Sequence, residues 1–237
     1  MKFVFSCLMS IFLASGLHAQ QVIYDENVEV RQIPAFSGIE LSGAVNLYLS
    51  QGNTTGVAVS AGDPKYNSKI KTEVRNGVLR ITVDGGMWNG FSLSDRKLKA
   101  YVSVADLNSL NVSGASLVRI SGIVKAKQLQ IQLTGASEIR GNIDADQLNM
   151  EVSGASVVKL AGIARQGNID AAGASKINSY ELQFNTLKAS TSGASNMRVT
   201  VNKELNADAS GGSSILYKGD AMSGRINASA GATIRKS

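Results

Sequence analysis

A short glycine-centred motif returns about every twenty residues through the second half of the chain. The motif occurs as SGAS at 113–116, 153–156 and 192–195, and as the variants TGAS at 134–137, AGAS at 172–175, SGGSS at 210–214 and AGAT at 230–233. Successive motif glycines are 21, 19, 19, 20, 18 and 20 residues apart. A fixed period in this range is typical of a solenoid, in which each repeat buries its apolar face against its neighbours.

The segments around the motif alternate between apolar and polar residues. Leu129, Ile131 and Leu133 precede the TGAS copy, and Val158 and Leu160 follow the second SGAS copy. Period-2 alternation indicates β-strands with one buried face. We therefore predict an all-β fold, a single-stranded, right-handed parallel β-helix with about twenty residues per rung. At about 4.8 Å per rung, seven rungs give a rod about 30 Å long.

The motif itself has three interpretations: a row of serine nucleophiles, a phosphate-binding loop, or a corner of the coil. A serine nucleophile needs a general base at a fixed position, and a phosphate loop needs a different glycine spacing followed by lysine. The corner explains each letter, because glycine permits unusual backbone angles, alanine is small enough to point into the bend, and hydroxyls bond turn backbone groups. The predicted corner glycines are Gly43, Gly114, Gly135, Gly154, Gly173, Gly193, Gly211 and Gly231.

The apolar positions become smaller in the later rungs. Ala189, Thr191, Ala207 and Ala209 stand where earlier rungs have leucine, valine or isoleucine, and Gly167 interrupts the alternation. We expect either that the cross-section narrows there or that a larger residue such as Phe184 fills the gap.

The first nineteen residues have the pattern of a secretory signal peptide. A single lysine precedes an apolar run from Phe3 to about Leu17, and Ala19 offers a small residue for cleavage. The apolar run is shorter than a membrane span. Cys7 and His18, the only cysteine and histidine, both lie in this segment. The exported chain is therefore expected to lack disulfides, Ser-His-Asp catalysis and His/Cys metal sites.

Residues 20–105 form a second region with longer alternating stretches. The RNGV sequence at 75–78 predicts a β-hairpin, because Asn-Gly suits the positive φ angles of a tight hairpin turn. SGAV at 42–45 resembles one more corner. This N-terminal β region is expected to cap the β-helix of residues 106–237, since an open end exposes a strand edge.

Charge and composition limit the partners. The chain has 24 basic and 18 acidic residues, and without Lys2 the basic excess is five. The two signs are interspersed, which indicates a solvated surface with weak attraction to anionic polymers. We predict no nucleic-acid binding, no transmembrane segment, no cofactor and no metal. The expected partners are a glycan or a protein at the cell surface, or a second copy of the chain.

Two groups of residues are candidate sites. Asp144 and Asp146 project to one side of a strand with Arg140 nearby, which suits a polysaccharide lyase or hydrolase, although such hydrolysis needs two carboxylates at a controlled separation. Trp88 and Phe91, in the glycine-rich loop 84–96, are the best candidates for contact with a ligand. Trp88 plugging the end of the coil is an equally good interpretation.

Four features follow one another along the chain: FSGIELSGAVNLYLSQG (36–52), KIKTEVRNGVLRI (69–81), LKAYVSVADLNSLNVSGAS (98–116) and the later Gly-Ala-Ser repeats. In this order they resemble the family of putative auto-transporter adhesins with a head GIN domain, a domain of unknown function known chiefly from Bacteroidetes. The resemblance implies an exported envelope or surface protein with a β-helix-like body. It transfers no catalytic motif.

Three functional hypotheses follow. The first is a non-catalytic envelope or surface protein, an adhesin or scaffold that presents a rigid β-helical rod in the periplasm, on the outer surface or outside the cell. The second is a polysaccharide-active β-helix enzyme that uses Asp144 and Asp146. The third is a flat Ser/Thr ladder that orders water or mediates self-association.

Overall fold

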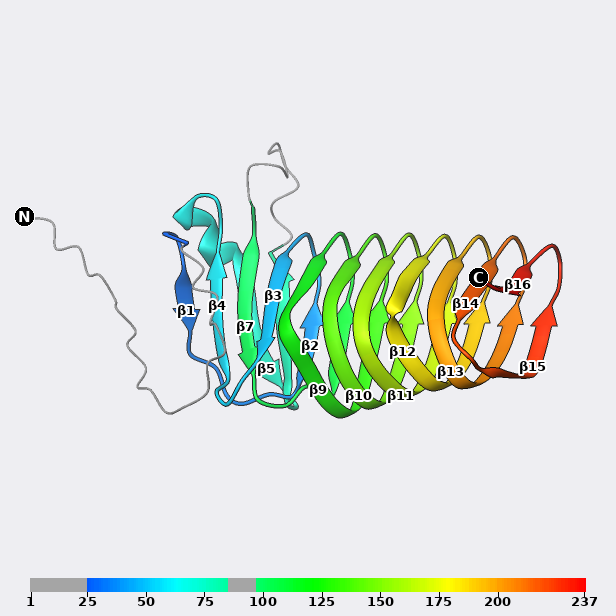
Figure 1. The fold of residues 1–237 in the computed structure, drawn as a ribbon. Helices are drawn as coiled ribbons and strands as arrows, with labels where there is room; N and C mark the ends of the chain where they lie inside the picture. The colour runs from blue at the N-terminus through cyan, green and yellow to red at the C-terminus, as the bar shows by residue number, and fades with distance from the viewer. Residues whose placement is uncertain (1–24, 85–96) are drawn as a thin grey trace, which may run out of the picture.

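The computed structural model describes residues 25–84 and 97–237. These residues wind into a parallel β-solenoid of about seven turns, with about 19 residues per rung and a mixed sheet at the N-terminal end. Figure 1 shows the rungs stacked side by side along one axis, from the cap to the C-terminal strands. The predicted parallel β-helix is therefore confirmed.

Each rung consists of a strand that leads into a corner and a strand that leaves it. In the first rung, β2 (Gly38–Leu41) and β3 (Asn46–Gln51) flank the corner at Gly43. In the second, β8 (Ser109–Val112) leads into Gly114 and β9 (Leu117–Leu133) leaves it. The later strands are β10 (Glu138–Val152), β11 (Val157–Ala171), β12 (Lys176–Thr191), β13 (Asn196–Ala209), β14 (Ser214–Lys218), β15 (Met222–Ala228) and β16 (Thr233–Lys236).

The long strands bend partway along their length and so cover two sides of the coil. The first part of β9 pairs with β3, and its last residues pair with β8. Glycines with positive φ lie at or near this bend in several rungs, including Gly122, Gly162 and Gly219. Every coil pairing is parallel. The segments on either side of the corners keep one register from rung to rung, so their positions form columns along the rod, whereas the register shifts near the bend, as between Val158 and Gly162.

The corner glycines stack directly on one another. All eight have positive φ, and the N–H that follows Gly135 donates to the carbonyl of Gly114 at 2.8 Å. A Cβ atom on Gly135 would lie 2.5 Å from that same carbonyl oxygen. Glycine is thus required twice, for the backbone angle and for the close approach of the next rung.

The prediction that the motif alanine points into the bend is wrong. Ala115, Ala136 and Ala155 are exposed, while the serine that follows each of them is buried. The tight glycine turn places the alanine on its outer side and returns the chain inward one residue later. The inward serine hydroxyl then satisfies carbonyl groups of the turn.

The core is one continuous apolar column that runs from the N-terminal strands to Ile215. Phe184 is fully buried, and a Cβ atom on Gly167 would lie 2.5 Å from its ring. Gly167 occupies an inward position, in register with Leu148 on one side and Leu187 on the other. Phe184 therefore fills the space that Gly167 leaves, and whether it also compensates for the small residues of the later rungs stays a prediction.

The N-terminal cap ends the parallel stacking. β6 (Val78–Val83) and β7 (Lys99–Val104) still pair in parallel with β2 and β3, as a further partial rung. Beyond them, β5 (Ile70–Arg75) pairs antiparallel with β6, and β4 (Gly56–Ser60) pairs antiparallel with β7. The strand β1 (Glu29–Arg31) pairs antiparallel with β4. We call β1, β4, β5 and the 3-10 helix η1 (Pro64–Lys69) the cap. The hairpin predicted at 75–78 joins β5 to β6, with positive φ at Asn76 and Gly77.

Candidate ligand-binding surface

The motif serines do not form a row of exposed nucleophiles. The serine at the fourth position of each motif, from Ser116 to Ser213, is between 0% and 2% exposed. Ser137 donates to the Thr134 carbonyl at 2.9 Å, and Ser195 donates to the Ser192 carbonyl at 2.8 Å. Some hydroxyls also meet between rungs, as Ser175 and Ser195 do at 3.2 Å. This hydroxyl ladder lies inside the coil, so it offers no outer surface to water or to a second copy.

Asp144 and Asp146 both contact one cation, but that cation is Arg165 from the next rung rather than Arg140. Arg165 Nη1 lies 2.9 Å from Asp144 Oδ1 and 3.2 Å from Asp146 Oδ1. Arg140 instead binds Glu138, with Nε 2.6 Å from Oε1. Asp144 and Asp146 side chains are 39% and 58% exposed. The pair is therefore a surface ion-pair cluster in which both carboxylates already share a partner.

The predicted ligand contacts Trp88 and Phe91 lie outside the described residues. The nearest strands before and after them in the sequence are β6 and β7, which form the partial rung next to the cap. Their proposed role stays a prediction.

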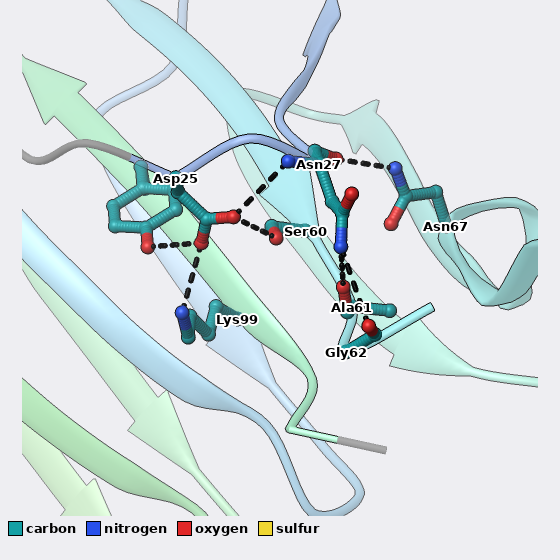
Figure 2. Close-up of polar contacts among 8 residues, drawn as sticks. Asp25, Asn27, Ser60, Ala61, Gly62, Asn67 and Lys99 are labelled. Carbon is teal, nitrogen blue, oxygen red and sulfur yellow. Dashed lines mark hydrogen bonds and ion pairs between the residues drawn. The ribbon is translucent and has the colours of Figure 1, made fainter. Parts of the chain in front are cut away.

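Among the described residues, the carboxylate with the most hydrogen-bond donors around it is that of Asp25, which lies just before β1 and beside the cap. Figure 2 shows its carboxylate between Ser60 and Lys99, with the backbone N–H of Asn27 nearby. Lys99 Nζ, Tyr101 Oη and Ser60 Oγ each donate to it at 2.8 Å. Burial alone raises the pKa of Asp25, but the hydrogen bonds from Lys99, Tyr101 and Ser60 outweigh burial and lower the pKa to about 2.

This network is structural. The Asp25 side chain is 8% exposed, and its partners are Ser60 of β4, Lys99 and Tyr101 of β7, and the backbone N–H of Asn27. Burial and then the hydrogen bond to Asp25 raise the pKa of Tyr101, so the phenol stays protonated and keeps donating. Asn27 and Asn67 extend the network, since the Asn67 amide donates to the Asn27 carbonyl at 2.7 Å. The group fastens the start of the described chain onto the cap.

A shallow groove of about 660 Å³ runs along the rod beside the corners. One of its walls is a column of side chains that lie two residues before the motif, or three residues before the AGAT copy. We call it the groove column, and its members are Gln132, Glu151, Asp170, Ser190, Asp208 and Asn227. Its other wall is formed by the small first residues of the motifs, such as Ser153 and Ser192. The groove exists because a column of longer side chains stands beside a row of short ones.

The chemistry of the groove column is mainly that of hydrogen-bond acceptors. Glu151 and Asp170 face each other in register, and Gln132 donates to Glu151 at 3.2 Å. Hydrogen bonds from Asn227 and then Arg225 lower the pKa of Asp208. Carboxylates and amides at fixed spacing along an open groove suit a long, hydroxyl-bearing chain better than a small enclosed ligand. Sequence reasoning missed this column, although its fixed place before the motif was a signal for it.

Two further observations concern the described residues, 25–84 and 97–237. Within these residues, no group of three or more side chains of the metal-binding types (histidine, cysteine, aspartate and glutamate) could hold a metal ion. No helix within them is long and apolar enough to cross a membrane.

Comparison with solved structures shows the same fold in three proteins. A putative adhesin from Bacteroides fragilis NCTC 9343 is 20% identical, with a TM-score of 0.81 over 89% of this chain and 96% of that one. A putative adhesin from Parabacteroides distasonis ATCC 8503 is 17% identical, with a TM-score of 0.70 over 89% and 96%. A putative lipid binding protein from the same organism is 20% identical, with a TM-score of 0.68 over 90% and 98%.

A search of the curated proteins found no match. The family model described as "Putative auto-transporter adhesin, head GIN domain" matches residues 35–221. That range begins in the first rung and ends in the last turns of the coil, so it includes every corner from Gly43 to Gly211. The chain therefore belongs to this head GIN domain family.

Proposed function

We propose that the protein is an exported, non-catalytic surface or envelope protein that presents its rigid rod for adhesion. The family and two of the compared structures carry the adhesin description, which supports this class of function. The signal-peptide pattern of residues 1–19 supports export. The groove carries the proposal, because it is open and has a polar side chain from each of six rungs along one wall.

The groove favours an extended glycan as the adhesion ligand. Its column offers one polar side chain per rung, so a chain that lies along the rod can repeat the same hydrogen bond from rung to rung. Glu151, Asp170 and Asp208 accept hydrogen bonds from sugar hydroxyls, and Asn227 supplies an amide. A rigid scaffold also avoids an ordering cost on binding.

A glycan-binding array with the full exported chain tests the proposal. We compare the wild type with Glu151→Ala/Asp170→Ala, which removes two neighbouring acceptors from the groove. Asp144→Ala/Asp146→Ala is the matched control, since it also removes two neighbouring exposed carboxylates but lies outside the groove lining. Binding that falls about tenfold or more in the groove variant and stays unchanged in the control supports the proposal.

The same variants separate adhesion from catalysis. If the wild type shortens any polysaccharide on the array and Asp144→Ala/Asp146→Ala abolishes that turnover, the protein is an enzyme and the proposal fails. Surface proteolysis of intact producing cells tests the location. A chain that is protected from protease in intact cells and released only with the periplasmic contents contradicts surface adhesion.

A further inference from the structure

A column of cations runs along the side of the coil formed by the strands that leave the corners. We call it the basic ridge, and its members are Arg119, Arg140, Lys159, Arg198 and Arg235. Arg140 faces Arg119 on one side and Lys159 on the other. Asn178 and Leu216 occupy the two rungs between the cations of the C-terminal half. All five ridge cations are exposed.

The fold gives no reason for this column. Like charges directly opposite each other on neighbouring strands destabilise a sheet, and strands of one sheet are only about 4.8 Å apart. Arg119, Arg140 and Lys159 stand in three successive rungs. Their alignment therefore opposes folding rather than assisting it.

The described residues of this side provide little compensation. Glu138 contacts both Arg140 and Lys159, at 2.6 and 3.0 Å, and is the one carboxylate among the outward positions of the strand segments 117–121, 138–140, 157–160, 176–180, 196–200, 214–218 and 233–236. Arg119 lies over the ring of Tyr48, 5.9 Å from its centroid. Arg198 and Arg235 form no ion pair with a described residue. Lys176 and Lys218 add further positive charge beside the ridge.

The length of the ridge indicates a polymer. Arg119 and Arg235 are six rungs apart, a distance of about 30 Å. A single phosphate or carboxylate would reach one or two of these cations. A linear chain with regularly spaced negative charges, lying along the rod, reaches all of them.

The neighbours of the ridge favour a sugar polymer over a lipid surface. Asn178 lies in the ridge column, and Asn196, Ser214 and Thr233 are the last three members of the adjacent column toward the corners. These side chains donate to and accept from hydroxyl groups. Leu216, the apolar member of the ridge column, is half-buried and so offers little to insert into a bilayer.

We infer that the basic ridge binds an acidic polysaccharide, a carboxylated or sulfated chain that lies parallel to the rod axis. The inference rests on the proposed export only in that such polymers are found in the envelope and outside the cell. It is independent of the groove, which is lined by different residues and carries the opposite charge.

The test is binding of the full exported chain to polygalacturonate and to dextran sulfate, with uncharged dextran as the neutral polymer, measured by calorimetry across a range of salt concentrations. The ridge variant is Arg119→Gln/Arg198→Gln/Arg235→Gln, which leaves both partners of Glu138 in place. The control variant is Lys127→Gln/Lys188→Gln/Lys203→Gln, which lowers the net charge equally with exposed lysines away from the ridge.

We expect the wild type to bind at least one acidic polymer and not dextran, with an affinity that falls steeply as salt rises. The ridge variant should lose about tenfold or more and show a shallower salt slope, while the control loses about threefold or less. The ridge variant should also unfold at the same or a higher temperature than the wild type, because Arg119 stands opposite Arg140, and Arg198 and Arg235 form no ion pair with a described residue.

Several results would overturn the inference. Equal losses in the two variants would mean that net charge alone drives binding. Failure to bind either acidic polymer rules the ridge out directly. Ridge-dependent binding to vesicles containing anionic phosphatidylglycerol, stronger than to the polymers, or ridge-dependent sedimentation as a dimer without polymer, would assign the ridge to a membrane or to a second copy. None of these results depends on the groove or on where the protein resides.

Discussion

The corners of the coil and the N-terminal cap are stabilised by different kinds of contact. In the coil, the carbonyl of one glycine accepts from the N–H that follows the next glycine, and the same contact recurs from Gly43 to Gly193. At the cap, Asp25 joins Ser60 of β4 to Lys99 and Tyr101 of the adjacent β7 in one buried group. The coil depends on a backbone contact that is repeated, whereas the cap depends on side chains that meet once. The two regions should therefore fail under different substitutions.

Gly135→Ala should have the largest effect. The new Cβ would lie 2.5 Å from the Gly114 carbonyl oxygen, and the residue has a φ of +76°. We expect a loss of about 4 kcal/mol in the free energy of unfolding, from backbone strain plus displacement of the neighbouring rung. Denaturation in urea measures it.

Gly77→Ala is the matched control in the hairpin between β5 and β6. Its φ of +74° is almost the same, but a Cβ there has nothing within 4 Å. We expect a loss of about 1 kcal/mol, from backbone strain alone. Equal losses at the two glycines would contradict the idea that rung stacking, rather than φ, determines the requirement for glycine in the coil.

Phe184→Ala should follow in size, with a loss of about 3–4 kcal/mol, because a fully buried ring leaves a cavity that Gly167 cannot fill. Adding Gly167→Leu should recover at least about 1 kcal/mol, since leucine stands at the neighbouring inward positions 148 and 187. Thermal unfolding of the single and double variants measures this coupling. If Gly167→Leu destabilises the Phe184→Ala variant further, then the idea that the Phe184 ring occupies the space of a missing side chain at position 167 is wrong.

Asp25→Asn tests the cap. Because the folded-state pKa of Asp25 is about 2 and the ordinary value is 3.8, the carboxylate contributes about 2 kcal/mol of stability above pH 4. The variant should lose about that amount at neutral pH. Asp146→Asn, which breaks an exposed ion pair in the coil, should have little effect.

The dependence of stability on pH provides a second way to compare the wild type with Asp25→Asn. A lowered carboxyl pKa stabilises the fold above its unfolded value, so this contribution should be lost as the pH falls from about 4 to about 2. The wild type should show this loss and Asp25→Asn should not. Parallel curves for the two proteins between pH 4 and pH 2 would show that another group is responsible.

Ala155→Lys should have the smallest effect. Ala155 stands at a corner but points outward, so a long side chain can extend into water, and we expect a change within about 0.5 kcal/mol. A large loss would show that the corner is more crowded than its exposure indicates. Ser156→Lys, one residue later and fully buried, provides the contrast, because it places a charge in the core.

The sequence predicted the coil well because its constraint is local and repeated. Each pattern that was used reflects a local backbone conformation that neighbouring residues cannot alter. These patterns are the spacing between the glycines, the alternation around them and the Asn-Gly turn. The direction of the motif alanine was predicted wrongly, since alanine and serine are both small enough for either side of the turn. Their places depend on which one finds a carbonyl partner inside the coil.

The candidate surfaces were harder to predict because they join residues about twenty positions apart. Arg165 binds Asp144 and Asp146 from the next rung, and nothing in the local sequence distinguishes it from Arg140. The groove column and the basic ridge become visible only when successive rungs are placed in register. One residue of misalignment would move each charge to the opposite face of the strand.

The sequence by itself determined that this chain coils, how many residues each rung takes, and where each rung turns. These properties follow from the φ angles that only glycine adopts readily and from the two-residue period of a strand. Only the tertiary structure decided which side chains stand next to one another along the rod. Examples are the buried serine ladder, the packing of Phe184 against Gly167, the Asp25 network and the two oppositely charged columns. The physical reason is that register and bending act between rungs, over distances that no local pattern records.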